Sequence, residues 1–534
     1  MTIANTQYQV NDLVFDEMMG RDGIRPIYRE LFDVYHGLAT EDLESRVAYL
    51  NARYLDTGVT FDFSGQEEAF PLDIVPRLIS AAEFAQTELG LKQRVRALEA
   101  FLADVYGSGQ LFNDGVIPRA VVTTSAHFIR AVAGYTPPNG VRIHVAGIDL
   151  IRDDAGGLRV LEDNARIPSG VSYVLTNRQA TAAALPEAVA RYNVARVDDY
   201  PARLRTALAK AAPSGIADPT IVVLTPGVHN SAYFEHAMLA RTMGVPLVEG
   251  RDLVVRHGVA YLRETTGLTQ VHVIYRRVDD EYIDPVKFRP DSLLGCAGLI
   301  SAQANGNLTI ANAVGNGVAD DKLVYSYVPD LIRYYLGEEP LIPNVDTWRL
   351  EDPVHREEVL DRIDELVVKP VDGSGGKGIL IGPSCSRAEL DAARERIIAD
   401  PRGWIAQPLI QLSTVPTMTD SGLEPRHVDL RPFIVNDGDD MWIAPGGLTR
   451  VALEKGQMIV NSSQGGGSKD TWVISPGSGG PDSETGRSVP VPNPDAQALE
   501  RLGTSILDVR SEEYLEQQQQ QQQQQSVTEE SPSC

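Results

Sequence analysis

The sequence of 534 residues predicts a mixed α/β fold with an N-terminal helical region and a disordered C-terminal tail. Between Ile24 and Gly107, apolar residues recur every three or four positions, which is the spacing of amphipathic helices. From Val116 onward, short apolar runs typical of strands alternate with helical patterns. After Ser475, glycine, proline and serine dominate, and such a composition buries too little apolar surface to fold.

The composition excludes several classes of protein. Apolar residues make up 43% and charged residues 23% of the chain, as in globular proteins with a sizeable core. Because the formal net charge is −25, we expect no nucleic-acid partner, which would need a concentrated basic surface. No apolar run reaches the roughly 18 residues of a membrane span, and no signal-peptide pattern is present. We therefore expect no membrane association and a cytoplasmic location.

The central part of the chain is predicted to contain a hairpin, an α/β unit and a strand-loop-strand unit. The hairpin consists of two extended runs around a turn-rich loop, at 143–151, 153–157 and 158–162. The other expected helices and strands are a helix at 179–192, a strand at 220–224, a helix from about 227 to 244, helices at 326–336 and 353–365, and strands at 366–369 and 379–381.

The predicted hairpin brings three oxygen-bearing side chains together. Asp149 lies nearly opposite Glu162, and Asn164 points from the same face two residues later. Carboxylate and amide oxygens are hard ligands that suit Mg²⁺. The pattern therefore indicates a magnesium site at these three residues, and a solvated acidic hairpin is the alternative interpretation.

A glycine-rich loop follows the strand at 366–369 and is typical of phosphate binding. Lys369 precedes it, and the loop itself contains Gly373, Ser374, Gly375, Gly376, Lys377 and Gly378. The glycines also fit a dinucleotide-binding pattern, but an apolar run typical of a strand follows at 379–381 in place of a helix. The P-loop pattern fails too, because Lys377 is followed by glycine. A flexible glycine hairpin is the alternative.

Further polar residues lie where an α/β sheet binds ligands. His229, Asn230 and Ser231 begin a helix after the strand at 220–224, which favours contact with a substrate. Asn230 or Ser231 acting as a plain helix N-cap is an equally weighted alternative. Arg276 either supports this site or pairs with the aspartates that follow it.

Two arginines are candidates for binding a transferred phosphoryl group. The spacing of His427, Asp429 and Arg431 places them on one face of a predicted strand, and Arg450 follows later in the chain. Taken singly, these segments fit a strand with an ordinary solvated face better.

Six segments, in their order along the chain, closely resemble the circularly permuted ATP-grasp proteins of type 2. They are EDNARIPSG (162–170), LTPGVHNSAYFEH (224–236), YRRVDD (275–280), NAVGNGVADDK (312–322), KPVDGSGGKG (369–378) and SSQGGGSKDTW (462–472). The resemblance covers residues 20–475. In the usual ATP-grasp order the acidic metal-binding residues follow the glycine flap, whereas here they precede it, as a permuted chain requires.

Sequence pattern, composition and the resemblance together predict a domain organisation. We expect an N-terminal helical region at 1–110, a circularly permuted ATP-grasp core at 111–475, and a disordered tail at 476–534 with a polyglutamine run at 517–525. Within the core, the expected units are the metal-binding hairpin at 143–170, a substrate-side α/β segment at 215–300 and an ATP-binding subdomain at 320–475.

The resemblance also implies roles for individual residues. Asp149, Glu162 and Asn164 would hold Mg²⁺. Lys322, Lys369 and the loop at 373–378 would bind the phosphates of ATP, while Gln407 and Leu409 would contact adenine. Related ligases carry an arginine two residues before the aspartate, where this chain has Gly147. The arginine that stabilises the transferred phosphoryl group must then be Arg431, Arg450 or Arg166.

The activity that the resemblance implies is an ATP-dependent carboxylate–amine ligase that acts through an acyl phosphate, on small-molecule or peptide substrates. No protein nucleophile is needed, so Cys296 is expected to be a core residue. An inactive ATP-binding scaffold that works with a partner protein and an ATP-dependent small-molecule kinase are the alternatives.

Overall fold

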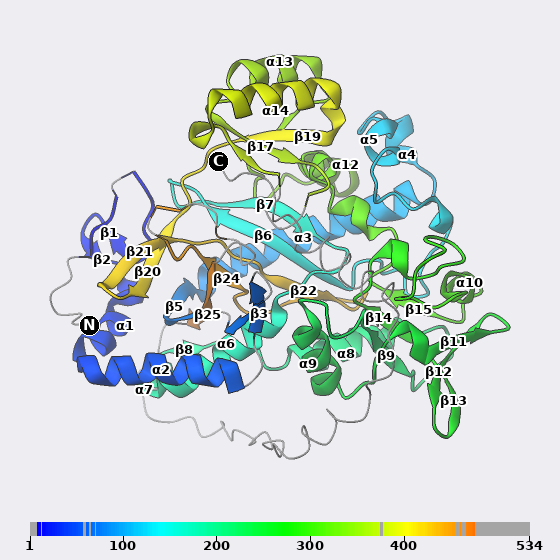
Figure 1. The fold of residues 1–534 in the computed structure, drawn as a ribbon, viewed down its shortest axis with the longest axis horizontal. Helices are drawn as coiled ribbons and strands as arrows, with labels where there is room; N and C mark the ends of the chain where they lie inside the picture. The colour runs from blue at the N-terminus through cyan, green and yellow to red at the C-terminus, as the bar shows by residue number, and fades with distance from the viewer. Residues whose placement is uncertain are drawn as a thin grey trace.

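The computed structural model describes residues 8–11, 13–56, 60–63, 66–69, 71–373, 378–454, 456–457, 460 and 466–475. They form the mixed α/β fold that the sequence predicts (Figure 1). The tail at 476–534, including the polyglutamine run, lies outside the described residues. Within the described part of the chain, no helix combines the length and apolar character that crossing a bilayer requires.

The N-terminal region contains the expected helices, but the prediction that it is helical throughout is wrong. Helices α1 (Pro26–Gly37), α2 (Thr40–Asp56) and α3 (Ala81–Val105) are interrupted by strands. The strands are β1 (Met19–Gly20), β2 (Gly23–Ile24), β3 (Thr60–Phe63), β4 (Gln66–Ala69) and β5 (Leu72–Ser80). Strand β5 is buried along nearly its whole length, so its apolar residues do not alternate with polar ones.

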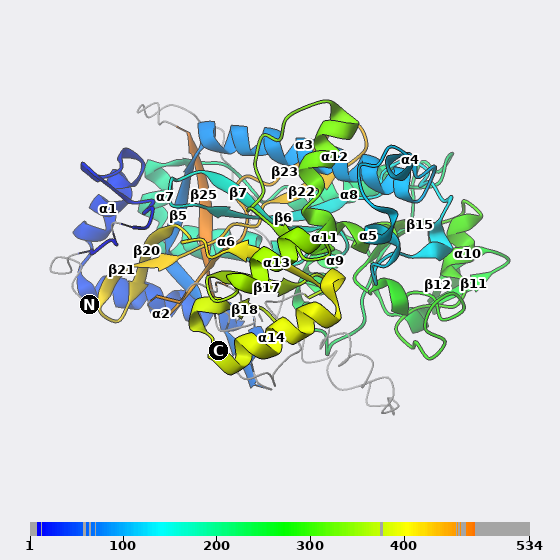
Figure 2. The ribbon, with the colours of Figure 1, turned by 90° about the horizontal axis from the view of Figure 1, so that it is seen from above.

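Strand β5 is held in place by pairing with a strand from the other end of the described chain. It pairs in parallel with β25 (Gly467–Ser475), and the two strands lie side by side in Figure 2. Strands β24 (Thr449–Val451) and β8 (Asn193–Val194) also pair with β25.

The predicted hairpin is confirmed and lies at the centre of the molecule. Strands β6 (Val145–Arg152) and β7 (Leu158–Asn164) are antiparallel, with Asp149 directly opposite Glu162. Strand β22 (Phe433–Asn436) pairs with the other edge of β6, and β23 (Met441–Ile443) completes this sheet. The arrangement brings the residues just before β22 next to the polar residues of the hairpin.

The predicted α/β unit is also present. The four-stranded parallel sheet has the order β10-β9-β14-β15, with bounds Leu247–Val248, Ile221–Leu224, Val273–Arg276 and Thr309–Ala311. Helix α9 (Tyr233–Met243) follows β9 and ends at Gly244 as expected. The helix expected at 179–192 is instead two helices, α6 (Val171–Ala184) and α7 (Pro186–Arg191), because Pro186 cannot continue a helix and starts the second one.

A smaller lobe lies above the hairpin in Figure 1. Its antiparallel sheet has the order β16-β19-β17-β18, with bounds Trp348–Arg349, Trp404–Pro408, Leu366–Pro370 and Leu380–Ile381. Helices α13 (Pro353–Asp361) and α14 (Arg387–Ala399) cover it and share a separate hydrophobic core with it. The expected strands before and after the glycine-rich loop are therefore confirmed as β17 and β18.

The remaining elements connect these parts. They are α4 (Gln110–Asn113), α5 (Arg119–Thr123), α8 (Tyr200–Lys210), α10 (Leu299–Ala304), α11 (Lys322–Tyr325), α12 (Val328–Leu336), β11 (Leu253–Arg256), β12 (Val259–Glu264), β13 (Gly267–Gln270), β20 (Thr414–Thr419) and β21 (Gly422–His427). The largest hydrophobic core joins α3 to β6 and to the α/β unit, and it contains Cys296. Burial raises the pKa of the Cys296 thiol to about 11, as expected of a core residue.

Candidate active site

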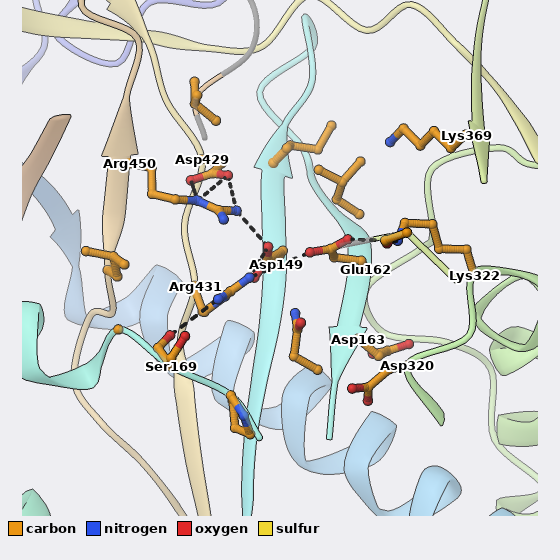
Figure 3. A pocket seen from close by; sticks show the side chains of 18 of the residues that line it. Asp149, Glu162, Asp163, Ser169, Asp320, Lys322, Lys369, Asp429, Arg431 and Arg450 are labelled. Carbon is orange, nitrogen blue, oxygen red and sulfur yellow. Dashed lines mark hydrogen bonds and ion pairs between the residues drawn. The ribbon is translucent and has the colours of Figure 1, made fainter. Parts of the chain in front are cut away.

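A cavity of about 410 Å³ lies where the hairpin, the small lobe and the α/β unit meet. Its walls come from β6 and β7, from β17 and β19, and from the first turns of α6 and α9. Figure 3 shows acidic and basic side chains from several of these elements pointing toward one another. The structure thus brings together residues that are hundreds of positions apart in the sequence.

Asp149 is the centre of a buried charge cluster. Arg431 donates from Nε to Asp149 Oδ1 at 2.5 Å and from Nη2 to Oδ2 at 2.8 Å. Arg450 donates from Nη2 to Asp149 Oδ2 at 2.6 Å and from Nε to Asp429 at 2.9 Å. Burial alone would raise the pKa of Asp149, but the two guanidinium groups hold it well below its usual range. Asp149 is therefore a carboxylate that orients two arginines.

Gly147 leaves room for one of these arginines. A Cβ atom at this position would lie 3.2 Å from Arg431 Cδ and 3.2 Å from Pro168 Cβ. Gly147 of β6 pairs with Phe433 of β22. Arg431 lies two residues before Phe433 in the chain, so it runs along the same edge of β6. The arginine side chain thus lies against the backbone at the position where the sequence lacks a side chain.

Glu162 and Asn164 lie beside this cluster with fewer partners. Glu162 is 3.6 Å from Arg431 and 3.7 Å from Lys322, and 29% of its side chain is exposed. The buried Nδ2 atom of Asn164 has no hydrogen-bond partner. Among the described residues, no group of three His, Cys, Asp or Glu side chains could hold a metal ion.

The oxygen donors of this site nevertheless fit Mg²⁺. A carboxylate offers about four lone pairs. On Asp149, three arginine hydrogen bonds and a side-chain hydrogen bond with Glu162 engage them, so Glu162, which lines the cavity, is the more accessible oxygen donor. Two carboxylates and one amide oxygen are hard ligands, and Mg²⁺ commonly takes its remaining ligands from water and phosphate.

The side of the cavity formed by the small lobe contains the residues expected to bind ATP. Lys322, Lys369, Gly373, Gln407 and Leu409 all line the cavity. Burial lowers the pKa of Lys369 to about 8, although Glu162 acts in the opposite direction. Lys322 donates a hydrogen bond to the Gly373 carbonyl at the start of the glycine-rich loop. Residues 374–377 of that loop lie outside the described residues, and Gly378 does not line the cavity.

The residues expected to bind the substrate divide into two groups. Ser231 lines the cavity, whereas His229 is exposed, Asn230 is buried, and neither lines it. The N-cap of α9 is Ala232, so neither Asn230 nor Ser231 fills that position. Arg276 is fully buried away from the cavity and pairs with Asp280 at 2.8 Å, which was the alternative interpretation of this arginine.

Sequence reasoning gave no separate role to two charged residues at this end of the cavity. Arg277 pairs with Glu235 at 3.0 Å, and both residues line the cavity. Glu235 also accepts hydrogen bonds from the backbone of Gly170 and Ser172, where α6 begins. Arg277 lies within the YRRVDD motif, but nothing in the sequence distinguished it from Arg276.

Arg166 lies in another corner of the cavity, away from the Asp149 cluster. It is 3.3 Å from Asp279 and 3.8 Å from Asp320. His127 lines the same cavity, and burial together with Arg166 and Lys322 lowers its pKa to about 3. His427, which shares the predicted face with Asp429 and Arg431, bonds instead to the Leu412 carbonyl and does not line the cavity.

Comparison with known proteins identifies the fold family. The circularly permuted ATP-grasp type 2 family matches residues 76–452, which is more than half of the chain. The chain belongs to this family. The family match therefore spans the hairpin, the α/β unit and the small lobe that form the cavity.

Several relatives of this ATP-grasp protein are known. An uncharacterized protein of Mycobacterium tuberculosis is 56% identical over 486 residues, covering 90% of this chain and 88% of the relative. An uncharacterized protein of Synechocystis is 50% identical and covers 86% of this chain and 97% of the relative. A Frankia alni protein named as a putative glutamate–cysteine ligase is 46% identical, and the match spans 86% of this chain but only 54% of that protein.

A solved structure has the same fold as this ATP-grasp chain. The glutathione synthetase-like effector of Globodera pallida, in its apo form, matches with a TM-score of 0.53. The match covers 82% of this chain and 98% of the effector at 11% sequence identity. At this identity the likeness concerns the fold alone.

Proposed function

We propose that this protein is an ATP-dependent ligase that joins a carboxylate to an amine through an acyl phosphate. The observation that carries the proposal is the single cavity in which the Asp149 cluster, Lys322 and Lys369 meet the residues at the start of α6 and α9. Membership of the ATP-grasp family supports the same reaction class. The name of the Frankia relative, putative glutamate–cysteine ligase, is consistent with this class, although the match spans 54% of that protein.

Each part of the cavity has a proposed role. Lys322 and Lys369 bind the phosphates of ATP, and Gln407 and Leu409 contact its adenine. Glu162 and Asn164, together with Asp149, would hold Mg²⁺, which neutralises phosphate charge when it is bound. Catalysis then consists mainly of positioning and charge stabilisation.

Arg431 and Arg450 are the proposed arginines for the transferred phosphoryl group. Both guanidinium groups are held by Asp149, so they are oriented before substrate binds. Arg166 is less suited to this role because it lies with Asp279 and Asp320 in a different corner. A substrate carboxylate attacks the γ-phosphate of ATP beside these arginines and displaces ADP. The amine then attacks the acyl carbon of the acyl phosphate, which forms the amide and releases phosphate.

The experiment measures ADP release from MgATP by the purified protein. Pools of amino acids and γ-glutamyl peptides are offered as carboxylates, and amino acids and polyamines as amines. We expect ADP release that requires one carboxylate and one amine, with an amide product found by mass spectrometry. Glu162→Gln, which removes an anionic ligand but keeps the shape, should lower Mg²⁺-dependent turnover at least about 100-fold.

Other outcomes would contradict the proposal in different ways. Binding of MgATP without ADP release in any pool would favour a scaffold that needs a partner protein. ADP release that leaves a stable phosphorylated product and no amide would favour a kinase. Full activity of Glu162→Gln would refute the assignment of Glu162 as a metal ligand without refuting the ligase reaction.

A further inference from the structure

We propose that the corner formed by Arg166 and Asp320 receives the amine substrate, and that the Asp320 carboxylate binds the ammonium group and accepts its proton. This inference rests on the ligase function proposed above. Asp320 lies just before α11, two residues from Lys322, and both side chains line the cavity. In Figure 3, Asp320 lies near Asp163 on the right of β7, whereas Asp149 and Arg431 lie on its left.

The amine must reach the acyl phosphate from a side that the Asp149 cluster does not occupy. Arg431 and Arg450, which pair with Asp149 and Asp429, form one wall of the cavity and are the proposed partners of the phosphoryl group. The Arg166 and Asp320 corner is on the opposite side of Glu162 and contains a carboxylate that an ammonium can contact.

Asp320 differs from four buried carboxylates that line the cavity in having no arginine nitrogen close to it. The four, Asp149, Asp163, Glu235 and Asp429, each have an arginine nitrogen within 3.0 Å. Asp320 is half-buried and lies 3.8 Å from Arg166 Nε, and it accepts hydrogen bonds from the backbone N–H groups of Ala165, at 2.6 Å, and Arg166. Its carboxylate therefore keeps capacity for a ligand in the cavity.

The surroundings of Asp320 also favour proton transfer near neutral pH. Burial raises the pKa of Asp320 to about 7, against the opposing effect of Arg166 and with a further contribution from the Asp163 carboxylate. His127 and Lys322 line the cavity nearby, and the low pKa of His127 keeps its imidazole neutral. A carboxylate of this basicity accepts an ammonium proton far more readily than an ordinary aspartate does.

The proposed step balances in atoms and charge. The ammonium transfers one proton to Asp320, and the neutral nitrogen attacks the acyl carbon. The new C–N bond forms as the bond between the acyl carbon and the phosphate oxygen breaks. The phosphate leaves with the second proton from nitrogen, and Asp320 then returns its proton to water.

Hydroxylamine separates this step from the formation of the acyl phosphate. It is largely unprotonated at neutral pH, so it traps an acyl phosphate as a hydroxamate without a base or a counter-ion. The test compares wild type with Asp320→Asn, using MgATP, the carboxylate pools, and either hydroxylamine or the amine pools. We expect Asp320→Asn to lower amide formation at least about 100-fold, mostly through kcat, while hydroxamate formation stays within about threefold.

A matched control is available at the other carboxylate beside Arg166. Asp279 pairs with Arg166 at 3.3 Å but does not line the cavity. Asp279→Asn removes the same charge from the same arginine, so it should leave the ratio of amide to hydroxamate unchanged. Melting temperatures of both variants show whether either change damages the fold.

The possible results lead to different conclusions. Equal loss of amide and hydroxamate in Asp320→Asn would overturn the proposed role, because Asp320 would then be needed before the amine reacts. Unchanged amide formation would overturn it as well. If wild type forms neither product in any pool, the ligase function itself fails, and the role of Asp320 fails with it.

Discussion

Gly147 affects Arg431 by leaving room for its side chain, not by bonding to it. Because residue 147 has no side chain, the aliphatic part of Arg431 can lie against β6 while its guanidinium group reaches Asp149. An arginine from the segment next to β6, rather than one on β6 itself, reaches Asp149. A glycine normally weakens the middle of a buried strand such as β6. Here the absence of a side chain at Gly147 is useful because it makes room for Arg431.

We predict that Gly147→Ala lowers carboxylate-dependent ADP release by about tenfold, because the added Cβ displaces Arg431 from the position in which Asp149 holds it. ATP binding should change little, since Lys369 and Gln407 lie on another wall. Steady-state kinetics and nucleotide titration measure the two effects. Gly37→Ala is the control, because a Cβ there meets no atom within 4 Å. Equal turnover of the two variants would show that Arg431 has room to adjust.

At the level of single residues, the sequence predicted the centre of the site better than its edges. Asp149 and Glu162 could be paired from the sequence because a hairpin with a short loop determines which residues face each other. The contact between Arg277 and Glu235 could not be predicted from the sequence. It joins the end of β14 to α9, and these elements meet only when the sheet packs. Arg276, the neighbour of Arg277 in the chain, points into a buried ion pair instead.

At the scale of secondary structure, the segment before β1 illustrates how a short piece of chain is held by charge. Glu17 accepts hydrogen bonds from Arg77 of β5 at 2.6 Å and from Arg152 of β6 at 3.1 Å. Arg77 donates a second bond, from Nε at 2.9 Å, and Ser413 donates a fourth at 2.8 Å. Arg77 itself is almost completely buried, so it depends on Glu17 for its neutralisation.

Glu17→Gln should destabilise the fold by about 3 kcal/mol at pH 7. Burial opposes ionisation of Glu17, but Arg77 and Arg152 lower its pKa from 4.5 to about 2. A lowered folded-state pKa stabilises the protein above pH 4.5, and this contribution is lost as the pH falls toward 2. Denaturant unfolding of wild type and variant should therefore differ most above pH 5 and converge in acid. The exposed Glu30→Gln on α1 is the control, and an equal effect there would contradict the prediction.

The elements that the sequence predicted best are those whose partners are close in the chain. The β6–β7 hairpin and the β17-loop-β18 unit are local, so their patterns were sufficient. Strand β5 was missed because its partner β25 is distant and both faces of β5 are buried, which removes the alternating pattern of a strand.

At the scale of the whole molecule, the described chain already completes its sheets at Ser475. Strand β25 pairs with β5, β24 and β8, which all lie in the described residues. We therefore predict that truncation after Ser475 changes neither the melting temperature nor the affinity for ATP. Calorimetry and nucleotide titration of the truncated and full chains provide the measurement. A fall in melting temperature of more than about 5 °C would show that the tail contributes to the fold.

The fold class and the family could be recognised from the sequence because six motifs lie in the permuted order. The motifs do not predict the division of the cavity into walls of different charge. That division depends on where β22 and α11 pack against the hairpin, and no motif describes such packing.

The pairing of β5 with β25 has a consequence for the synthesis of the chain. The buried ion pair between Asp73 and Lys469 joins residues 396 positions apart. At roughly 5 to 20 residues per second, a ribosome takes about 20 to 80 s to reach Lys469 after it has added Asp73. Throughout that interval the apolar strand β5 has emerged but lacks its partner, so the nascent protein exposes an edge that chaperones can bind. The permuted order thus postpones completion of this sheet until translation is nearly finished.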